Sequence, residues 1–257
     1  KSTNVITAAA WASGGNYPGT IYAAGATGNT PAGLLFGGYT GSAGATATNE
    51  YDGSTWTGGG ALPVGKRYLA GLGTQTAGLA AKGKQNPGPR VATSEEYDGS
   101  SWTAGGTASV AADSVIGCGT QTSGLVFGGN VPSPPPYSQT TSTEEYGGTS
   151  WTSGGNLVQK RSQLGGAGTQ TTGLAFGGTI QTPPSITGHT EEYDGSSWTS
   201  QPNTMTARWA FGSAGTQTAG YGFGGYTPPQ TTATEVYDGT AWATQPSMAT
   251  ARVYNSG

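Results

Sequence analysis

Six tryptophans divide the chain at nearly equal intervals and constrain its fold more than any other feature. The intervals are 45, 46, 49, 47 and 44 residues, between Trp11, Trp56, Trp102, Trp151, Trp198 and Trp242. A glycine follows each of the first five by 27 residues, at positions 38, 83, 129, 178 and 225. A tyrosine precedes each of the last five by five residues, at positions 51, 97, 146, 193 and 237. A period of about 40 to 50 residues is typical of a β-propeller.

All variation in repeat length falls between the glycine and the tyrosine. This connection measures 13, 14, 17, 15 and 12 residues in the five repeats, whereas the other spacings are constant. A fixed scaffold with one variable connection indicates that function lies in the variable part. Because the connection joins the same two strands in every repeat, we expect all five variable loops on one face, beside the segments that run from Trp to the next basic residue.

The fourth repeat shows most clearly how one period divides into four strands. Small residues at 162–168 suit the crowded strand next to an axis, and 173–178 form a short apolar strand that ends in two glycines. Residues 190–193 predict a third strand, and Trp198 starts a fourth. Between them, Asp194-Gly195 predicts a tight hairpin turn. The chain is therefore predicted to be all-β, with blades of four strands, in a single domain over 1–257.

The order of these motifs resembles the kelch repeat. Gly222-Phe223-Gly224-Gly225 is followed by Tyr237-Asp238, then Trp242, then Ser247-Met248-Ala249-Thr250-Ala251-Arg252. The resemblance implies a propeller whose innermost strand follows the arginine. Ala81-Lys82-Gly83 departs from it, so we expect the second blade to be irregular there. The sequence segments Gly-Thr-Gln-Thr and Glu-Tyr-Asp-Gly-Ser-Ser-Trp-Thr are similar to those of kelch-like repeats in proteins of bacterial viruses, especially marine ones.

The number of blades depends on how the ring closes. The inner strand and the Trp strand each occur six times, but the two middle strands occur five times. We expect five blades, with a six-bladed ring left incomplete as the alternative. The surplus terminal strands are then candidates for pairing with a neighbouring subunit. The chain opens and ends within repeats, so it is expected to be a processed product or a piece of a longer protein.

Composition excludes several classes of partner. The net charge is −3 and the pI about 5.0, with no basic stripe, so no nucleic acid is expected to bind. No apolar run reaches membrane-spanning length, so no membrane insertion is expected. Cys118 is the only cysteine, which rules out an intrachain disulfide and is typical of a small core residue.

The sequence contains few residues of the types that enzymes use for catalysis or metal binding. His189 is the only histidine, in a loop where the plain interpretation is a solvated side chain, and the carboxylates are spread over the repeats. We expect no metal, no cofactor and no enzyme activity, with an enzyme on a propeller scaffold as a remote alternative. The repeated glutamates are interpreted as scaffold residues that face the basic residue ten positions after each Trp, namely Lys66, Arg161, Arg208 and Arg252. Ile21 and Ala112 interrupt that series.

Binding residues are predicted in the variable loops and at the entrance to the axis. Trp209 is the one tryptophan outside the period, and the matching positions hold Tyr22, Arg67, Asp113, Ser162 and Val253. Tyrosines among short hydroxyl residues and prolines are typical of binding loops. The predicted ligand-binding residues are Tyr39, Lys84, Arg90, Tyr137, His189, Trp209 and Tyr226.

The expected function is recognition by a structural protein of a virion, such as a tail fibre, or of an extracellular appendage. Its partners would be a cell-surface glycan or protein, other subunits of the assembly, and further copies of the chain. A neutral glycan would bind by stacking, with little dependence on salt, whereas a charged one would depend on Lys84 and Arg90. The alternative is a purely structural decoration or filament subunit whose loops contact only neighbouring copies.

Overall fold

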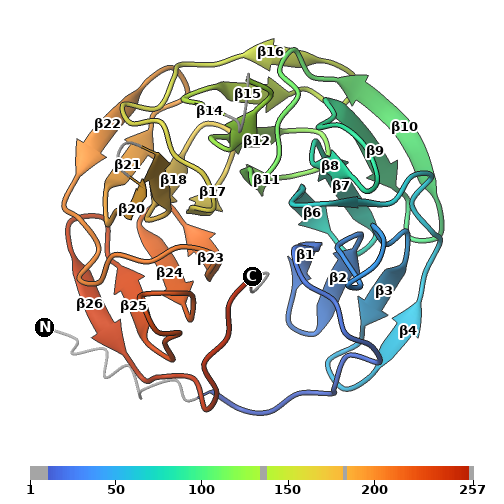
Figure 1. Cartoon of the computed structure of the whole chain (residues 1–257), viewed down its shortest axis with the longest axis horizontal. Coiled ribbons are helices and arrows are strands. Elements are labelled where there is room, and N and C mark those ends of the chain that lie inside the picture. Colours follow the sequence, from blue (N-terminus) through green and yellow to red (C-terminus); the bar gives the residue numbers. More distant parts are fainter. Residues whose placement is uncertain (1–10, 134–137, 182–183, 255–257) are drawn as a thin grey trace, which may run out of the picture.

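Five four-stranded antiparallel sheets stand around a central axis as the blades of a β-propeller (Figure 1). The computed structural model describes residues 11–133, 138–181 and 184–254. Each blade is built from one repeat, and the chain runs from the innermost strand outwards. The predicted all-β fold, the four strands per repeat and the five blades are therefore confirmed. No helix in the described part of the chain is long and apolar enough to span a membrane.

Equivalent strands of the five blades follow the predicted motifs. The innermost strands are β1 (Gly25–Asn29), β6 (Ala70–Thr74), β11 (Ile116–Gly119), β17 (Gly165–Gly168) and β23 (Gly212–Thr216). The second strands are β2 (Ala32–Phe36), β7 (Ala77–Ala81), β12 (Gly124–Phe127), β18 (Gly173–Phe176) and β24 (Ala219–Phe223). The third are β3 (Thr48–Tyr51), β9 (Thr93–Tyr97), β15 (Thr143–Tyr146), β21 (Thr190–Tyr193) and β25 (Thr234–Tyr237). The outermost are β4 (Trp56–Gly58), β10 (Trp102–Thr107), β16 (Trp151–Ser153), β22 (Trp198–Gln201) and β26 (Trp242–Gln245).

Two of the variable loops contain small two-stranded ribbons, and a third loop forms a ribbon with the segment that enters its blade. These pair β5 (Lys66–Arg67) with β8 (Lys84–Gln85), β13 (Asn130–Val131) with β14 (Ser138–Gln139), and β19 (Thr179–Gln181) with β20 (Pro184–Ile186). In every blade, the residue after the landmark glycine pairs with the residue that leads into the innermost strand, as Ser162 does with Thr179. All five loops therefore lie on the face of the Trp-to-Arg segments, as predicted.

The tryptophans hold neighbouring blades together. Trp198 packs on Phe127 of the preceding blade, with ring centroids 4.8 Å apart, and its Nε1 donates a hydrogen bond to Thr143 Oγ1 at 2.9 Å. Trp102 and Trp242 make the same contacts. These three indoles are buried. The interpretation of the periodic tryptophans as blade-packing residues is therefore confirmed for these blades.

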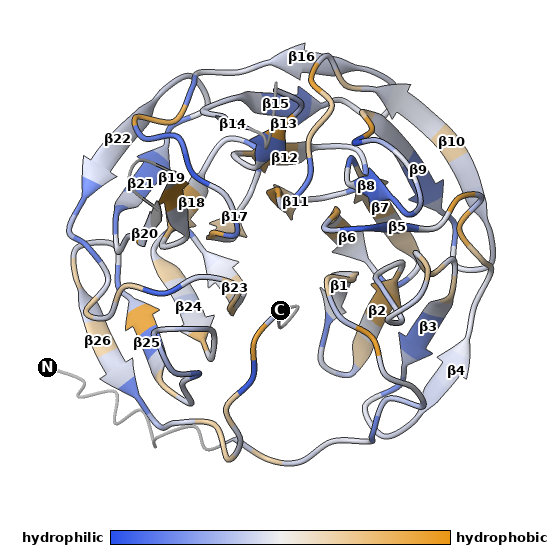
Figure 2. Ribbon diagram, in the orientation of Figure 1, coloured by the Kyte–Doolittle hydropathy of each residue, from blue (hydrophilic) through white to orange (hydrophobic). Residues whose placement is uncertain are grey.

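Two further contacts recur between neighbouring blades. Tyr193 donates its hydroxyl hydrogen to Glu145 Oε1 of the preceding blade at 2.6 Å. Gln170 of the first turn donates to the carbonyl oxygens of Gly124 and Tyr146 in the blade before it, at 3.3 and 2.9 Å. The third strands β3, β9, β15 and β21, which carry glutamates, contain strongly hydrophilic segments in Figure 2. The repeated polar residues are thus used between blades.

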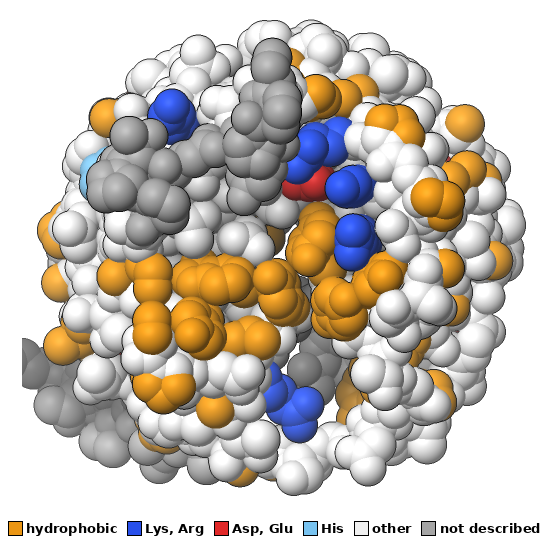
Figure 3. Space-filling view, viewed as in Figure 1, with side chains coloured by type: hydrophobic (Ala, Val, Ile, Leu, Met, Phe, Trp, Pro, Cys, Tyr) orange, Lys and Arg blue, Asp and Glu red, His pale blue; other side chains and the backbone are white. Residues whose placement is uncertain are grey.

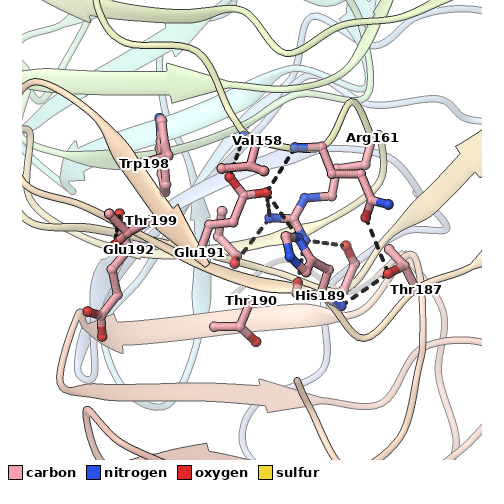
Figure 4. Close-up of polar contacts among 12 residues, drawn as sticks. Val158, Arg161, Thr187, His189, Thr190, Glu191, Glu192, Trp198 and Thr199 are labelled. Atoms are coloured by element: carbon pink, nitrogen blue, oxygen red, sulfur yellow. Dashed lines mark hydrogen bonds and ion pairs between the residues drawn. The ribbon is translucent and has the colours of Figure 1, made fainter. Parts of the chain in front are cut away.

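The glutamate two residues before the third-strand tyrosine forms a buried ion pair in the second, fourth and fifth blades, as the scaffold interpretation requires. Lys66, Arg161 and Arg208 pair with Glu95, Glu191 and Glu235, respectively. Arg161 and Glu191 are fully buried and 2.8 Å apart (Figure 4). Burial lowers the pKa of Arg161 to about 10, and the charge of Glu191 opposes that shift. Each of these pairs ties the segment entering a blade to the third strand of that blade.

The irregularity at Ala81-Lys82-Gly83 compensates for a missing cation in the next blade. Ala112 stands where other repeats have Lys or Arg, and Glu144 is nevertheless buried. Lys82 reaches Glu144 from the preceding blade and forms the ion pair instead. Lys82 does so from a position with φ +58°, a left-handed conformation that a glycine occupies in the other repeats. The two departures from the repeat, Lys82 and Ala112, therefore belong together: the ion pair of Glu144 is kept, but its cation comes from the preceding blade.

Six equivalent residues circle the axis, although there are five blades. Their backbones all have φ between 52 and 56°, and their N–H groups form a chain of hydrogen bonds to the carbonyl of the preceding member. The six are Ala23, Tyr68, Ser114, Gln163, Ala210 and Tyr254. The fifth bond joins Tyr254 N to Ala210 O at 2.6 Å. The ring therefore has six positions, and Tyr254 belongs to the sixth.

The N-terminal part of the chain occupies the outer edge of this sixth position. Trp11 packs on Phe223 of the fifth blade, with ring centroids 5.0 Å apart, and donates to Thr234 Oγ1, as Trp102, Trp198 and Trp242 do to the blades before them. On the other side, Gly15 N donates to the Tyr51 hydroxyl of the first blade, as Gly155 does to Tyr193. The two terminal segments thus occupy a sixth ring position beside the five complete blades, and neither residues 11–24 nor residues 252–254 form a strand there.

Candidate functional site

Five pairs of side chains surround the axis on the loop face, and we call this ring the axis mouth. Each pair combines the residue that leads into an innermost strand with the residue after the landmark glycine of the same repeat. The pairs are Tyr22 with Tyr39, Arg67 with Lys84, Asp113 with Asn130, Ser162 with Thr179, and Trp209 with Tyr226. The backbone arrangement is the same in all five, but the chemistry differs in each. A scaffold that repeats while its side chains vary is the geometry of a recognition surface.

One side of the axis mouth is aromatic. Trp209 lies 5.5 Å from Tyr226 and 5.8 Å from Tyr254 between ring centroids. Tyr254 lies 6.2 Å from Tyr22, which is 5.2 Å from Tyr39. All five rings are half-buried, so each keeps an exposed part. Such rings offer flat, rigid apolar surface at small entropic cost.

The other side holds a polar pocket of about 200 Å³. Arg67, Lys84 and Arg90 line it together with Asp113. Arg90 Nε is 3.0 Å from Asp113 Oδ2, so one of the three cations is paired with the only carboxylate of the lining. Figure 3 shows basic side chains gathered around an acidic one beside the central opening, next to a band of hydrophobic side chains. The pocket has three cations against one anion and is therefore positive in an acidic protein.

Arg67 connects the aromatic side to the polar pocket. Its guanidinium carbon lies 4.4 Å from the ring centroid of Tyr39 and 5.3 Å from that of Tyr68. These cation–π contacts fix the guanidinium in place. Its Nε is buried without a hydrogen-bond partner in the described part of the chain. Burial raises the pKa of Tyr68 to about 12, so this ring stays neutral beside the arginine.

A second cavity of about 130 Å³ continues along the axis beneath the mouth. Tyr68, Ser114 and Gln163 line both cavities. The wall below them consists of small residues of the innermost strands, such as Gly71 and Gly117. A ligand at the axis mouth would therefore meet a shaped recess with polar groups at its rim.

Hydrogen bonds between loops stabilise the mouth. Gln139 of the third loop donates from Nε2 to the carbonyl oxygen of Thr179 in the fourth loop at 2.8 Å, and to the Ser162 hydroxyl at 3.1 Å. Asn130 Nδ2 donates to Asp113 Oδ1 at 3.2 Å. Asn130 is buried, and its Oδ1 has no partner among the described residues. The loops are tied together at the pocket, which reduces the cost of ordering them on binding.

The structure brings together five of the seven predicted ligand-binding residues. Tyr39, Lys84, Arg90, Trp209 and Tyr226 all lie at the axis mouth. Tyr137 lies outside the described residues. His189 is not part of the mouth: its Nδ1 is 3.2 Å from Glu191 Oε1 and its carbonyl oxygen accepts from Arg161 (Figure 4). His189 therefore belongs to the ion-pair network of the fourth blade, and its side chain is less solvated than a free loop residue.

Sequence reasoning missed Arg67, Tyr68, Tyr22 and Tyr254 as site residues. Arg67 and Tyr22 occupy the same repeat position as Trp209, so the variation at that position was a usable signal. The pairing of this position with the residue after the landmark glycine could not be seen, because the two residues, such as Tyr22 and Tyr39, are 17 positions apart in sequence. A comparison with models of known protein families and with curated proteins finds no match to this chain.

Proposed function

We propose that this chain is a non-enzymatic recognition module that binds an acidic glycan at the axis mouth. The observation that carries the proposal is the junction of exposed aromatic rings with a positive pocket at Arg67. Sugar rings stack on aromatic faces, while a carboxylate of the same sugar accepts hydrogen bonds from a guanidinium. Arg90 is neutralised by Asp113, so Arg67 and Lys84 are the groups available to a ligand carboxylate.

We further propose that the propeller is of the kelch type and serves on a virion or extracellular appendage. The kelch assignment is supported by the order of Phe-Gly-Gly, Tyr-Asp, Trp and Arg in the fifth repeat, whose Trp242 packs on Phe176 of the preceding blade. The viral setting is supported by the wording of the Gly-Thr-Gln-Thr turn, whose glutamine joins blades. In such a setting the propeller would present the axis mouth to a cell-surface glycan.

The experiment measures binding of a uronic-acid trisaccharide and of its neutral methyl ester by calorimetry. Arg67→Ala should weaken binding of the acid by about tenfold or more, since a hydrogen bond to a charged group contributes roughly 1.5–3 kcal/mol. It should leave the ester almost unaffected. Trp209→Ala should weaken both ligands, because stacking does not depend on charge. Binding of the acid should also weaken as salt is raised.

Lys160→Ala provides the matched control. Lys160 is exposed and does not line the pocket, so the variant removes the same charge without touching the axis mouth. If Arg67→Ala and Lys160→Ala bind the acid equally well, the pocket does not recognise the carboxylate. If the ester binds as tightly as the acid, the ligand is recognised by stacking alone.

A further inference from the structure

The sixth ring position leaves one face of the fifth blade open. In the second strand, one leucine of each of the first four blades points toward the next blade and is at most 1% exposed: Leu34, Leu79, Leu125 and Leu174. The equivalent residue of the fifth blade is Tyr221, which is 43% exposed. In the innermost strand, Ala214 is exposed, whereas its equivalents Leu72 and Ala167 are buried. The fifth blade thus presents the surface that its predecessors bury.

Hydrogen-bond acceptors remain at the same face. In the first four blades, the glutamine of the following blade donates to the carbonyl oxygens of a second-strand glycine and a third-strand tyrosine, as Gln217 does with Gly173 and Tyr193. The equivalent carbonyls of the fifth blade belong to Gly220 and Tyr237. Within the described part of the chain, no glutamine donates to them. The interface that forms between successive blades four times in this chain is therefore present on one side only at the fifth blade.

The two ends of the sixth position are already in place. Trp11 stands where the outer tryptophan of a sixth blade would stand, and Tyr254 stands at the start of its innermost strand. Only the inner two strands are needed to cover Tyr221, because Leu174 is covered in this way by the next blade's second strand at Gly220. The geometry thus specifies both the length and the sequence pattern of the segment that fits.

We propose that the sixth position is a docking site for a β-hairpin with the inner two-strand pattern of this repeat. The repeated blade-to-blade interface supplies the fit. The hairpin's glutamine would donate to the Gly220 and Tyr237 carbonyls, and its small residues would pack on Tyr221. Such strand addition is a known way in which β proteins join.

The test uses a hairpin that copies residues 164–178, which begin at the ring place after Gln163, the equivalent of Tyr254. It is added as a free peptide and, in a second variant, fused directly after Tyr254 to raise its effective concentration. Hydroxyl-radical footprinting follows the side chains of Tyr221 and Trp11. The hairpin should lower oxidation of Tyr221 severalfold and raise the melting temperature. The control hairpin carries Gln170→Ala, which removes the donor, and Gly173→Val, which adds bulk at the contact. A Cβ at Gly173 would lie 2.8 Å from Leu125 of the preceding blade, and Leu125 is the equivalent of Tyr221.

Three results would overturn the proposal. Tyr221 could oxidise at the same rate with and without both forms of the hairpin. The control hairpin could protect it as well as the copy does, which would mean non-specific cover. Tyr221 could already be protected at high protein concentration, with a dimer in light scattering, which would identify a second copy as the occupant.

Discussion

At the scale of single residues, the repeats keep the same interactions even where the residues that make them differ. Glu144 keeps a buried cation although Ala112 cannot supply it, because Lys82 reaches across from the preceding blade. In the first blade, Ile21 and Asn49 replace both members of the ion pair, and Asn49 Nδ2 donates to the Tyr17 hydroxyl. The sequence shows these departures one at a time. It could not show that Lys82 and Ala112 belong together, because that pairing depends on how blades face each other.

Lys82 gives a direct test of this compensation. Lys82→Ala should destabilise the protein by about 3–5 kcal/mol, since it leaves Glu144 charged, buried and without its cation. The double variant Lys82→Gly with Ala112→Arg should recover most of the loss, because it restores the arrangement of the fourth and fifth blades. Denaturant unfolding measures both. Equal stability of the single and double variants would mean that the arginine does not replace the lysine.

At the scale of the blade, the sequence predicted nearly everything. The fixed spacings place Trp, Tyr and Gly in the same environment in every repeat, so the four strands, the hairpin turns and the common face of the loops followed from the period. The hairpin aspartates also behave alike: the Ser101 N–H and the Ser100 groups lower the pKa of Asp98 to about 2. The loop interiors were not predictable, since their short ribbons, such as β13 with β14, depend on pairing across variable lengths.

The tryptophan interface should show graded costs. Trp198→Ala should cost about 3–5 kcal/mol, because the indole is buried between Phe127 and Tyr193. Trp11→Ala should cost much less, since Trp11 is 47% exposed at the incomplete sixth position. Tyr226→Ala should cost least, within about 1 kcal/mol, as a half-exposed loop residue. Thermal and denaturant unfolding of the three variants give the order. Similar losses for Trp198 and Tyr226 would show that the loops are part of the scaffold.

At the scale of the whole molecule, five blades occupy a ring with six positions. The count of strands in the sequence allowed this arrangement but did not decide it, because closure depends on the angle between blades, which the repeat period does not give. The ring also determines how the candidate binding site is arranged. It brings the aromatic pairs of the first and fifth blades to one side of the axis mouth and the charged pairs of the second and third to the other.

The central claim is that this junction binds an acidic sugar, and a crystal structure of the chain with a uronic-acid trisaccharide tests it most directly. The account predicts a sugar carboxylate within hydrogen-bonding distance of Arg67 and Lys84, with a sugar ring against the aromatic side formed by Tyr39, Trp209 and Tyr226. A trisaccharide bound on the opposite face, or on the outer strands away from the axis, would contradict it.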